Sequence, residues 1–151
     1  MAELTIQFYH LLSTPLEKAL PSLMAKALDG EHRVAIHSAD AKQRKAISDA
    51  MWKQQKFLPH GEAAAEHASE QPILLSETMA RDNGADVLVI LDGAELETAE
   101  GFTKVLDVFN GADDAAVTAA RTRWARYKEE GYALHYIKQQ PNGGWKKEAE
   151  A

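Results

Sequence analysis

The sequence predicts an α/β domain of Rossmann-like type, in which helices cover both faces of a mostly parallel sheet in three layers. Three observations predict it. Strand-like and helix-like segments alternate along the chain. Residues 86–92 (DVLVILD) form a nearly continuous apolar run, which is typical of a central parallel strand covered on both faces. Residues 111–131 have a glycine at each end and no internal glycine or proline, which indicates an independently capped helix.

The chain begins with a strand and a helix. Residues 4–9 (LTIQFY) alternate apolar and polar side chains and predict the first strand. In residues 14–17 (TPLE), a hydroxyl cap, a proline at the first helical position and a carboxylate three residues on predict a helix start. Helical spacing of apolar residues continues to Gly30, and we expect Pro21 to kink or restart this helix.

A second strand and helix follow. The short apolar run 34–37 predicts a strand, and residues 40–43 (DAKQ) predict a capping box for a helix that continues through Met51. We expect the chain to leave that helix and turn at Pro59. Residues 62–71 are polar and alanine-rich without a clear period, so we expect a surface loop or a weak helical turn.

The middle of the chain contains the strongest strand signal. Residues 72–76 predict a strand that is followed by a short turn of helix ending at residues 83–84, and the run 86–92 is the central strand described above. We expect residues 98–109 to form a helix, because four apolar residues recur there at helical spacing. These four are Phe102, Val105, Leu106 and Phe109.

The last part of the chain completes the sheet. After the capped helix 111–131, residues 132–138 (YALHYIK) alternate and predict a strand towards an edge. Residues 139–144 (QQPNGG) predict a turn that brings in a last short piece with Trp145. The length suits one domain, which we expect to span residues 1–151.

The helix at 111–131 has two unlike faces. At about 100° per residue, one side gathers residues that suit close packing on a sheet. These are Ala116, Ala119, Ala120, Arg123 and Tyr127. A neighbouring stripe places Val117 and Trp124 beside Arg121 and Lys128. This stripe suits an acidic peptide with an apolar terminal residue, although a solvated face with a cation over an aromatic ring has the same pattern.

Charge is distributed unevenly along the chain. The formal net charge of −6 argues against a general affinity for nucleic acids. Lys and Arg number 10 against 19 Asp and Glu in residues 1–116, but 7 against 2 in residues 117–147. The basic character is therefore concentrated in the last fifth of the chain, and we expect an acidic surface or peptide as the partner there.

Composition argues against membrane, redox and catalytic roles. No apolar run reaches membrane-spanning length and the N-terminus lacks a signal-type segment, so we expect a cytoplasmic protein without membrane association. Cysteine is absent, which excludes disulfides and cysteine ligands. The histidines form no HxH or HExxH pair and the serines no GxSxG elbow, so we predict neither a metal site nor catalytic residues.

Rossmann-like folds commonly bind a nucleotide cofactor, but the glycines that would bind its phosphates are missing from this sequence. The loop after the first strand contains no glycine, and no GxxxxGK[ST] motif occurs. We therefore predict no cofactor. Asp92 and Gly93 end the central strand in the manner of a phosphate-loop ATPase, but without the partner loop a strand-ending turn is the preferred interpretation.

Trp52 and Phe57 flank a helix end and an apolar loop that contains a proline. A tryptophan in this position is commonly packed into the local core. The alternative is an exposed aromatic anchor for another protein.

Six segments, in order along nearly the whole chain, resemble the chi subunit of bacterial DNA polymerase III. They are MWKQQKFLPHG (51–61), QPILLS (71–76), NGADVLVILDG (83–93), FTKVLDVFNG (102–111), AARTRWARYKEEGY (119–132) and GGW (143–145). Single pieces would be weak signals, but the ordered set is specific.

The resemblance implies a non-catalytic accessory subunit of the clamp-loader complex, with a Rossmann-type fold that binds no nucleotide. It also implies that the protein connects the polymerase holoenzyme to single-stranded-DNA-binding protein by holding that protein's acidic C-terminal tail, which ends in a phenylalanine carboxylate. The family's central arginine falls on Arg121 and the adjoining aromatic residue on Trp124. With Val117 and Lys128, these form the expected tail-binding stripe.

Two lysines that assist binding in a relative fall on Val117 and Ala125 in this chain. The resemblance therefore leaves the contribution of charge open. Arg123, Arg126 and Lys128 are the expected substitutes.

The family's second surface binds the psi subunit or a helicase-like protein through an aromatic pair, which falls on Trp52 and Phe57. Two other functions stay open. One is a small nucleotide-binding or hydrolytic α/β enzyme that uses the strand ends near Asp92. The other is a direct nucleic-acid binder through the C-terminal basic patch, which the acidic first 116 residues disfavour.

Overall fold

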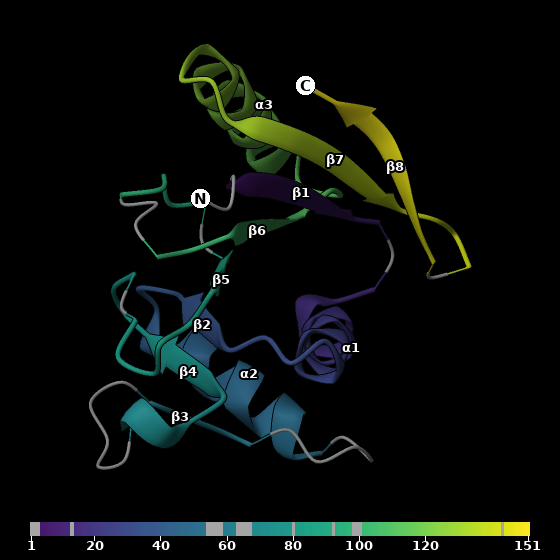
Figure 1. The fold of residues 1–151 in the computed structure, drawn as a ribbon. Helices are drawn as coiled ribbons and strands as arrows, with labels where there is room; N and C mark the ends of the chain where they lie inside the picture. Colours follow the sequence, from purple (N-terminus) through teal and green to yellow (C-terminus); the bar gives the residue numbers. More distant parts are fainter. Residues whose placement is uncertain are drawn as a thin grey trace.

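The computed structural model describes residues 4–12, 14–53, 59–62, 68–79, 81–91, 93–97, 101–142 and 144–151. Within them, the predicted α/β architecture is confirmed: one eight-stranded, mostly parallel sheet is covered by helices on both faces (Figure 1).

The sheet has the spatial order β3-β4-β2-β5-β6-β1-β7-β8. Neighbouring strands are parallel except for β7 and β8, which are antiparallel. The strands are β1 (Thr5–Leu11), β2 (Val34–His37), β3 (His60–Glu62), β4 (Ile73–Ser76), β5 (Val87–Ile90), β6 (Lys104–Asn110), β7 (Ala133–Gln139) and β8 (Trp145–Glu150). The strand β5 lies in the interior of the sheet, as its unbroken apolar run predicts.

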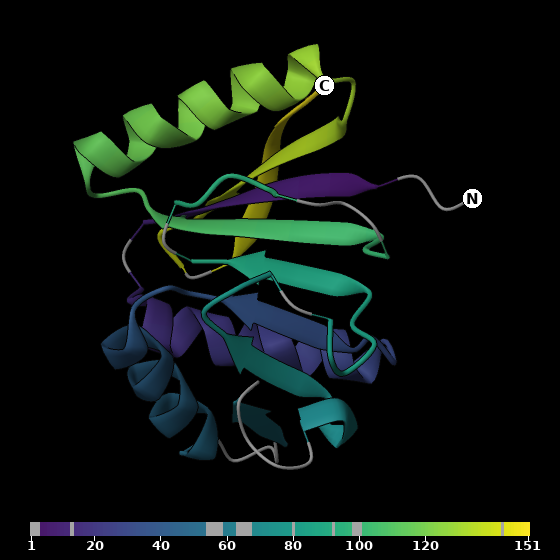
Figure 2. The same cartoon turned by 90° about the vertical axis from the view of Figure 1, so that its left-hand side faces the viewer.

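The two faces of the sheet carry different helices. The helices α1 (Leu16–Asp29) and α2 (Ala41–Trp52) cover one face, and α3 (Asp114–Glu129) covers the other (Figure 2). Alternation along the strands divides the core accordingly: Val34 and Ile36 of β2 pack in the cluster under α1 and α2, whereas Ala35 packs in the cluster under α3.

The helix predicted over residues 98–109 is wrong. Its described part contains β6, which is inserted between β5 and β1 in the middle of the sheet. Residues 105–109 are all buried, because helices cover both faces of this strand. A strand that is buried on both faces has few polar positions, so a subset of its apolar residues matches helical spacing by coincidence.

The start of α1 also differs from the prediction. Its N-cap is Pro15, and no side chain among the described residues caps the helix. The hydroxyl of Thr14 instead accepts a hydrogen bond from Nε2 of Gln139 at 2.7 Å, which ties this loop to β7. The restart that was one of the two expectations at Pro21 does not occur, because one helix continues through this residue. The helix ends before Gly30, as predicted.

Several shorter segments agree only in part with the sequence prediction. Asp40 caps α2 as predicted by accepting from the backbone N of Lys42 at 2.9 Å, but Gln43 accepts from the hydroxyl of Ser38 instead of closing a capping box. The helical turn expected near residues 83–84 is wrong, since the described residues of 77–84 form bends and a turn. The described end of the segment 62–71 contains a 3₁₀ turn at Ala68–Glu70, which agrees with the weak helical turn, one of the two expectations there. The edge strands β3 and β8 were not predicted.

Candidate functional site

The helix α3 is fixed at both ends in the way that its sequence predicts. The carboxylate of Asp113 accepts from the backbone N of Ala115 at 3.0 Å and of Ala116 at 3.4 Å, and Gly131 after the helix has a φ of 89°. Because α3 connects β6 to β7, and these strands flank β1, the helix lies across β1.

The buried side of α3 is built around an ion pair. Arg123 donates to Asp107 of β6 through Nε at 2.7 Å and through Nη2 at 3.0 Å, and the two side chains are only 5% and 1% exposed. The guanidinium also lies over the ring of Phe8, 6.0 Å from its centroid. Arg123 is therefore committed to the core and is not available as a substitute for a ligand-binding lysine. Ala119, which was expected on this buried side, is exposed.

Arg121 precedes Arg123 by two residues, which turns its side chain by about 200° around the helix. It is exposed and lines a hollow of about 400 Å³ on the α3 side of the sheet. The other lining residues come from β1, β7, β8 and α3 itself: His10, Trp124, Tyr136, Lys138, Glu148 and Ala149.

Aromatic rings form the floor of this hollow. Trp124 is half-buried and meets Phe8 edge to face, with ring centroids 5.5 Å apart, and its ring centroid is 6.0 Å from that of Tyr136. Val117 is also half-buried against the same cluster, but it does not line the hollow. The structure thus brings Arg121 and Trp124 of the predicted stripe together and gives Val117 a supporting position.

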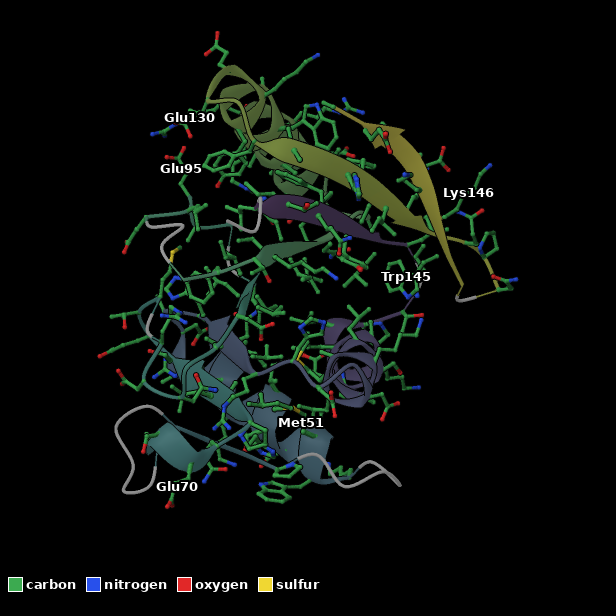
Figure 3. All side chains as sticks on the ribbon, in the orientation of Figure 1. Met51, Glu70, Glu95, Glu130, Trp145 and Lys146 are labelled. Carbon is green, nitrogen blue, oxygen red and sulfur yellow. The ribbon has the colours of Figure 1, made fainter. Side chains whose placement is uncertain are left out.

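The remaining cations of α3 are placed differently. Lys128 is exposed and follows Arg121 by seven residues, about 10 Å along the helix axis, and it does not line the hollow. Arg126 pairs with Glu130 at 3.3 Å and with Glu95, two carboxylates that lie close to the end of α3 (Figure 3). These contacts raise the pKa of Arg126, chiefly through the hydrogen bond with Glu130. The guanidinium stays protonated, and the two carboxylates offset its positive charge.

The hollow also contains a histidine and a tyrosine in contact. Nδ1 of His10 lies 2.5 Å from the hydroxyl of Tyr136. Burial lowers the pKa of His10, and the cations Lys138 and Arg121 lower it further. Burial raises the pKa of Tyr136; Arg121 opposes this rise, and Glu148 adds to it. Two cations, a hydroxyl and an aromatic floor can together receive a carboxylate that is attached to an apolar group.

Sequence reasoning missed His10, Tyr136 and Lys138. The alternation of residues 132–138 was a usable signal, because it places Tyr136 and Lys138 on the same face as the buried Leu134. The contribution of His10 required the pairing of β1 with β7, which sets it opposite Lys138. No local pattern in the sequence indicates that pairing.

Trp52 lies far from this hollow, at the end of α2. Its side chain is 57% exposed and its ring centroid is 4.2 Å from that of His60 on β3. The interpretation that Trp52 packs in the local core is therefore wrong: the side chain is exposed, as an anchor for another protein requires. Phe57, its expected companion, lies outside the described residues.

The structure gives little support for a metal site, a phosphate site or a membrane span. In the described part of the chain, no group of three His, Cys, Asp or Glu side chains is placed to hold a metal ion. Asp92 lies outside the described residues. A hollow of about 510 Å³ lies near the carboxyl ends of β1 and β6, but its charged lining residue is Glu17, which disfavours a phosphate. Among the described helices, none has the length and apolarity that a membrane span requires.

Comparison with known proteins identifies a family. The model of the family described as DNA polymerase III chi subunit, HolC, matches residues 4–135, which include α3 and all of the hollow's lining residues from β1 and α3. No curated protein matches the chain.

Proposed function

Because this chain belongs to the DNA polymerase III chi subunit family, we propose that it binds the acidic C-terminal tail of single-stranded-DNA-binding protein through the hollow beside α3. Members of the family are non-catalytic accessory subunits of the polymerase III holoenzyme. Tail binding links single-stranded-DNA-binding protein to the clamp-loader complex during DNA replication, and this role places the protein in the bacterial cytoplasm.

The observation that carries the proposal is that the exposed Arg121 lines the same hollow as the aromatic side chains of Trp124 and Tyr136. Arginine presents a planar fork of donors that matches both oxygens of a carboxylate. Trp124 and Tyr136 offer ring surfaces next to that fork, and a terminal phenylalanine brings a carboxylate and an apolar ring on one residue. Both parts of such a residue are thus matched within one hollow.

The rest of the tail is acidic, and the cations around the hollow suit it. Lys138 lines the hollow beside Arg121, and Lys128 extends the positive surface towards the end of α3. Charge-assisted contacts in a partly exposed groove support affinity in the micromolar range, about −8 kcal/mol. Added salt weakens the binding, because exposed charges are screened.

Calorimetry with a synthetic tail peptide tests the proposal. Arg121→Ala should weaken binding by about 1.5 to 3 kcal/mol, since it removes a hydrogen-bonded charge contact. The matched control is Arg126→Ala, which removes an equal charge from the same helix at a side chain that is already paired with Glu95 and Glu130. An affinity that survives in Arg121→Ala, or falls equally in both variants, would contradict the assignment of Arg121.

Trp52 is exposed at the end of α2. We propose that Trp52, with Phe57, forms a second binding surface that contacts the psi subunit or a helicase-like protein. Aromatic side chains that are exposed on a monomer are common anchors of protein interfaces. Trp52→Ala should abolish capture of such a partner in a pull-down while tail-peptide affinity stays unchanged, and retention of the partner would reject this surface.

A nucleotide-binding enzyme is the alternative from another class. A thermal-shift screen with nucleotides separates the two, because a ligand at a hundred times its dissociation constant stabilises a protein by about 2.7 kcal/mol. We expect no shift with nucleotides and a shift with the tail peptide. We also expect no strong binding of single-stranded DNA in the absence of its binding protein.

A further inference from the structure

Arg121 and Lys138 do not account for the whole polar lining of the hollow. His10 is 9% exposed, yet it is among the lining residues, and its Nδ1 lies 2.5 Å from the hydroxyl of Tyr136. Heavy-atom positions alone leave open which of the two groups donates this hydrogen bond. The direction of donation decides what Tyr136 offers to a ligand.

The imidazole of His10 is held in place on two sides. Its ring centroid is 5.2 Å from that of Phe109, edge to face. A Cβ at Gly111 would lie 2.0 Å from Nε2 of His10, so the ring packs directly against the glycine backbone. The contact between His10 and Tyr136 is therefore a fixed feature of the site, and a change of protonation can act through it without moving the rings.

Two states of this pair have opposite effects on an anion. When Nδ1 of His10 carries no proton, the hydroxyl of Tyr136 donates to it and turns a lone pair towards the hollow. When the imidazole is charged, Nδ1 donates to the tyrosine oxygen, and the hydroxyl proton is free to point at a ligand. The second state adds both a positive charge and a hydrogen-bond donor.

We propose that His10 is a third cation of this site, charged when an anionic chain terminus is bound, and that through Tyr136 it adds a hydroxyl donor to the ligand carboxylate. This inference rests on the proposed tail-binding function. In that binding reaction, a proton is taken from the solvent onto the imidazole as the carboxylate enters, so anion and proton bind together. His10 is in this sense a positioning residue for Tyr136.

The charges that face His10 support the coupling. Burial lowers the pKa of His10 most, and Lys138 on β7 and Arg121 on α3 lower it further, so both effects favour the neutral imidazole in the free protein. A bound carboxylate places a negative charge beside both cations and reduces their effect on His10. Glu148 on β8 is the acidic lining residue of the hollow, and Asp107 on β6 is already paired with Arg123. The pKa of His10 therefore rises on binding.

The sign of the linkage follows from these states. A group whose pKa is higher in the complex takes up protons on binding, so affinity increases as the pH falls through the interval between the two pKa values. A rise of one pKa unit corresponds to tenfold in affinity. We expect tail-peptide binding to be roughly tenfold tighter at about pH 5.5 than at about pH 8. The carboxylates of the peptide are ionised at both pH values, so their titration does not cause the difference.

Calorimetry of the full chain tests this with a synthetic peptide of several aspartates that ends in phenylalanine with a free carboxylate. Titrations in buffers of different ionisation enthalpy should reveal net proton uptake on binding. An NMR titration of the His10 imidazole in the wild-type protein should give a higher pKa in the complex than in the free protein, and this measurement needs no variant.

Variants separate His10 from the other histidines. His10→Asn keeps an acceptor near the position of Nδ1 but cannot be charged, so its affinity should stay at the weaker, high-pH level throughout. The matched control, His135→Asn, removes a histidine on the other face of β7 and should keep the wild-type pH profile.

The outcomes are distinguishable. Tight binding with a flat pH profile and no proton uptake would overturn the role of His10 and leave the proposed function intact. Proton uptake that persists in His10→Asn would equally overturn it. Absence of peptide binding at every pH would remove both proposals.

Discussion

The two faces of the sheet are covered in different ways. On one face, α1 and α2 lie together over a cluster of aliphatic and methionine side chains, which includes Leu20, Leu23, Met24, Ile47 and Met51. On the other face of the described structure, α3 is the helix that covers β6, β1 and β7, and the cluster beneath it contains Phe8, Phe102, Phe109 and Tyr127 together with the Arg123–Asp107 ion pair (Figure 2).

This difference locates the candidate site. A pair of helices closes its face with apolar contacts, whereas a single helix leaves the strip towards β7 and β8 uncovered, and there the hollow forms. Aromatic residues such as Trp124 serve both the core and the surface, because one part of the ring packs inward while the rest meets solvent. Rigid rings at an open edge are suited to binding a partner.

The largest expected effect concerns the ion pair under α3. Arg123→Ala should lower the free energy of unfolding by about 3–5 kcal/mol, because it leaves the carboxylate of Asp107 buried without its partner. Arg121→Ala should change it by no more than about 0.5 kcal/mol, since Arg121 is exposed. Denaturant titrations of both variants measure the contrast.

A double variant sharpens that result. Replacing both partners with apolar residues, Asp107→Leu with Arg123→Met, should recover most of the lost stability, because no unpaired charge remains in the core. Equal losses of stability in Arg121→Ala and Arg123→Ala would contradict the division of α3 into a core side and a ligand side.

The next effect concerns the opposite face. Leu20→Ala in α1 should cost about 2–5 kcal/mol, because the side chain is fully buried in the aliphatic cluster and its loss creates a cavity. Tail-peptide affinity of the folded fraction should stay unchanged, since the hollow lies across the sheet. Calorimetry below the unfolding transition checks this, and a parallel loss of affinity would show that the two faces are coupled.

The sequence predicted the class of fold because most segments obey local rules. The apolar run that forms β5 and the caps of α3 lead to the observed elements directly. It failed at β6, where burial on both faces removed the alternation that marks a strand. The charged sequence of β8 has little strand propensity, and it forms a strand because β7 offers an open edge for pairing.

That one error also affected the site. Helical spacing placed Arg123 on the packed side of α3, as observed, but residues 98–109 were assigned to a helix and supplied no partner for it. In a strand, Asp107 and Phe109 share a face, which points both towards α3. If β6 had been recognised as a strand, Arg123 would have been identified as a structural residue that pairs with Asp107. Of the two arginines Arg121 and Arg123, Arg121 would then have remained as the exposed one.

A smaller effect concerns the start of α3. Asp113→Ala should destabilise the protein by about 1 kcal/mol, because its carboxylate caps two backbone N–H groups at the first turn. Tail binding should weaken little, since the aromatic contacts of Trp124 hold the ligand side of the helix independently. Thermal unfolding measures the first effect and calorimetry the second. A large loss of affinity would mean that the cap, and not the rings, fixes the site.

The smallest expected effect is a gain. Ala125 is exposed and follows Arg121 by four residues, so it lies on the same side of α3, at one of the positions where the family resemblance places a lysine. Ala125→Lys should tighten tail-peptide binding by about 0.2–1 kcal/mol at low salt, the range of exposed charge pairs, and the gain should vanish as salt is added. Ala119→Lys is the matched control: it adds the same charge at an exposed position that faces away from Arg121. If both variants increased the tail-peptide affinity equally, the increase would come from the net charge of the protein. The side of α3 that carries Arg121 would then not be the specific binding surface for the acidic tail.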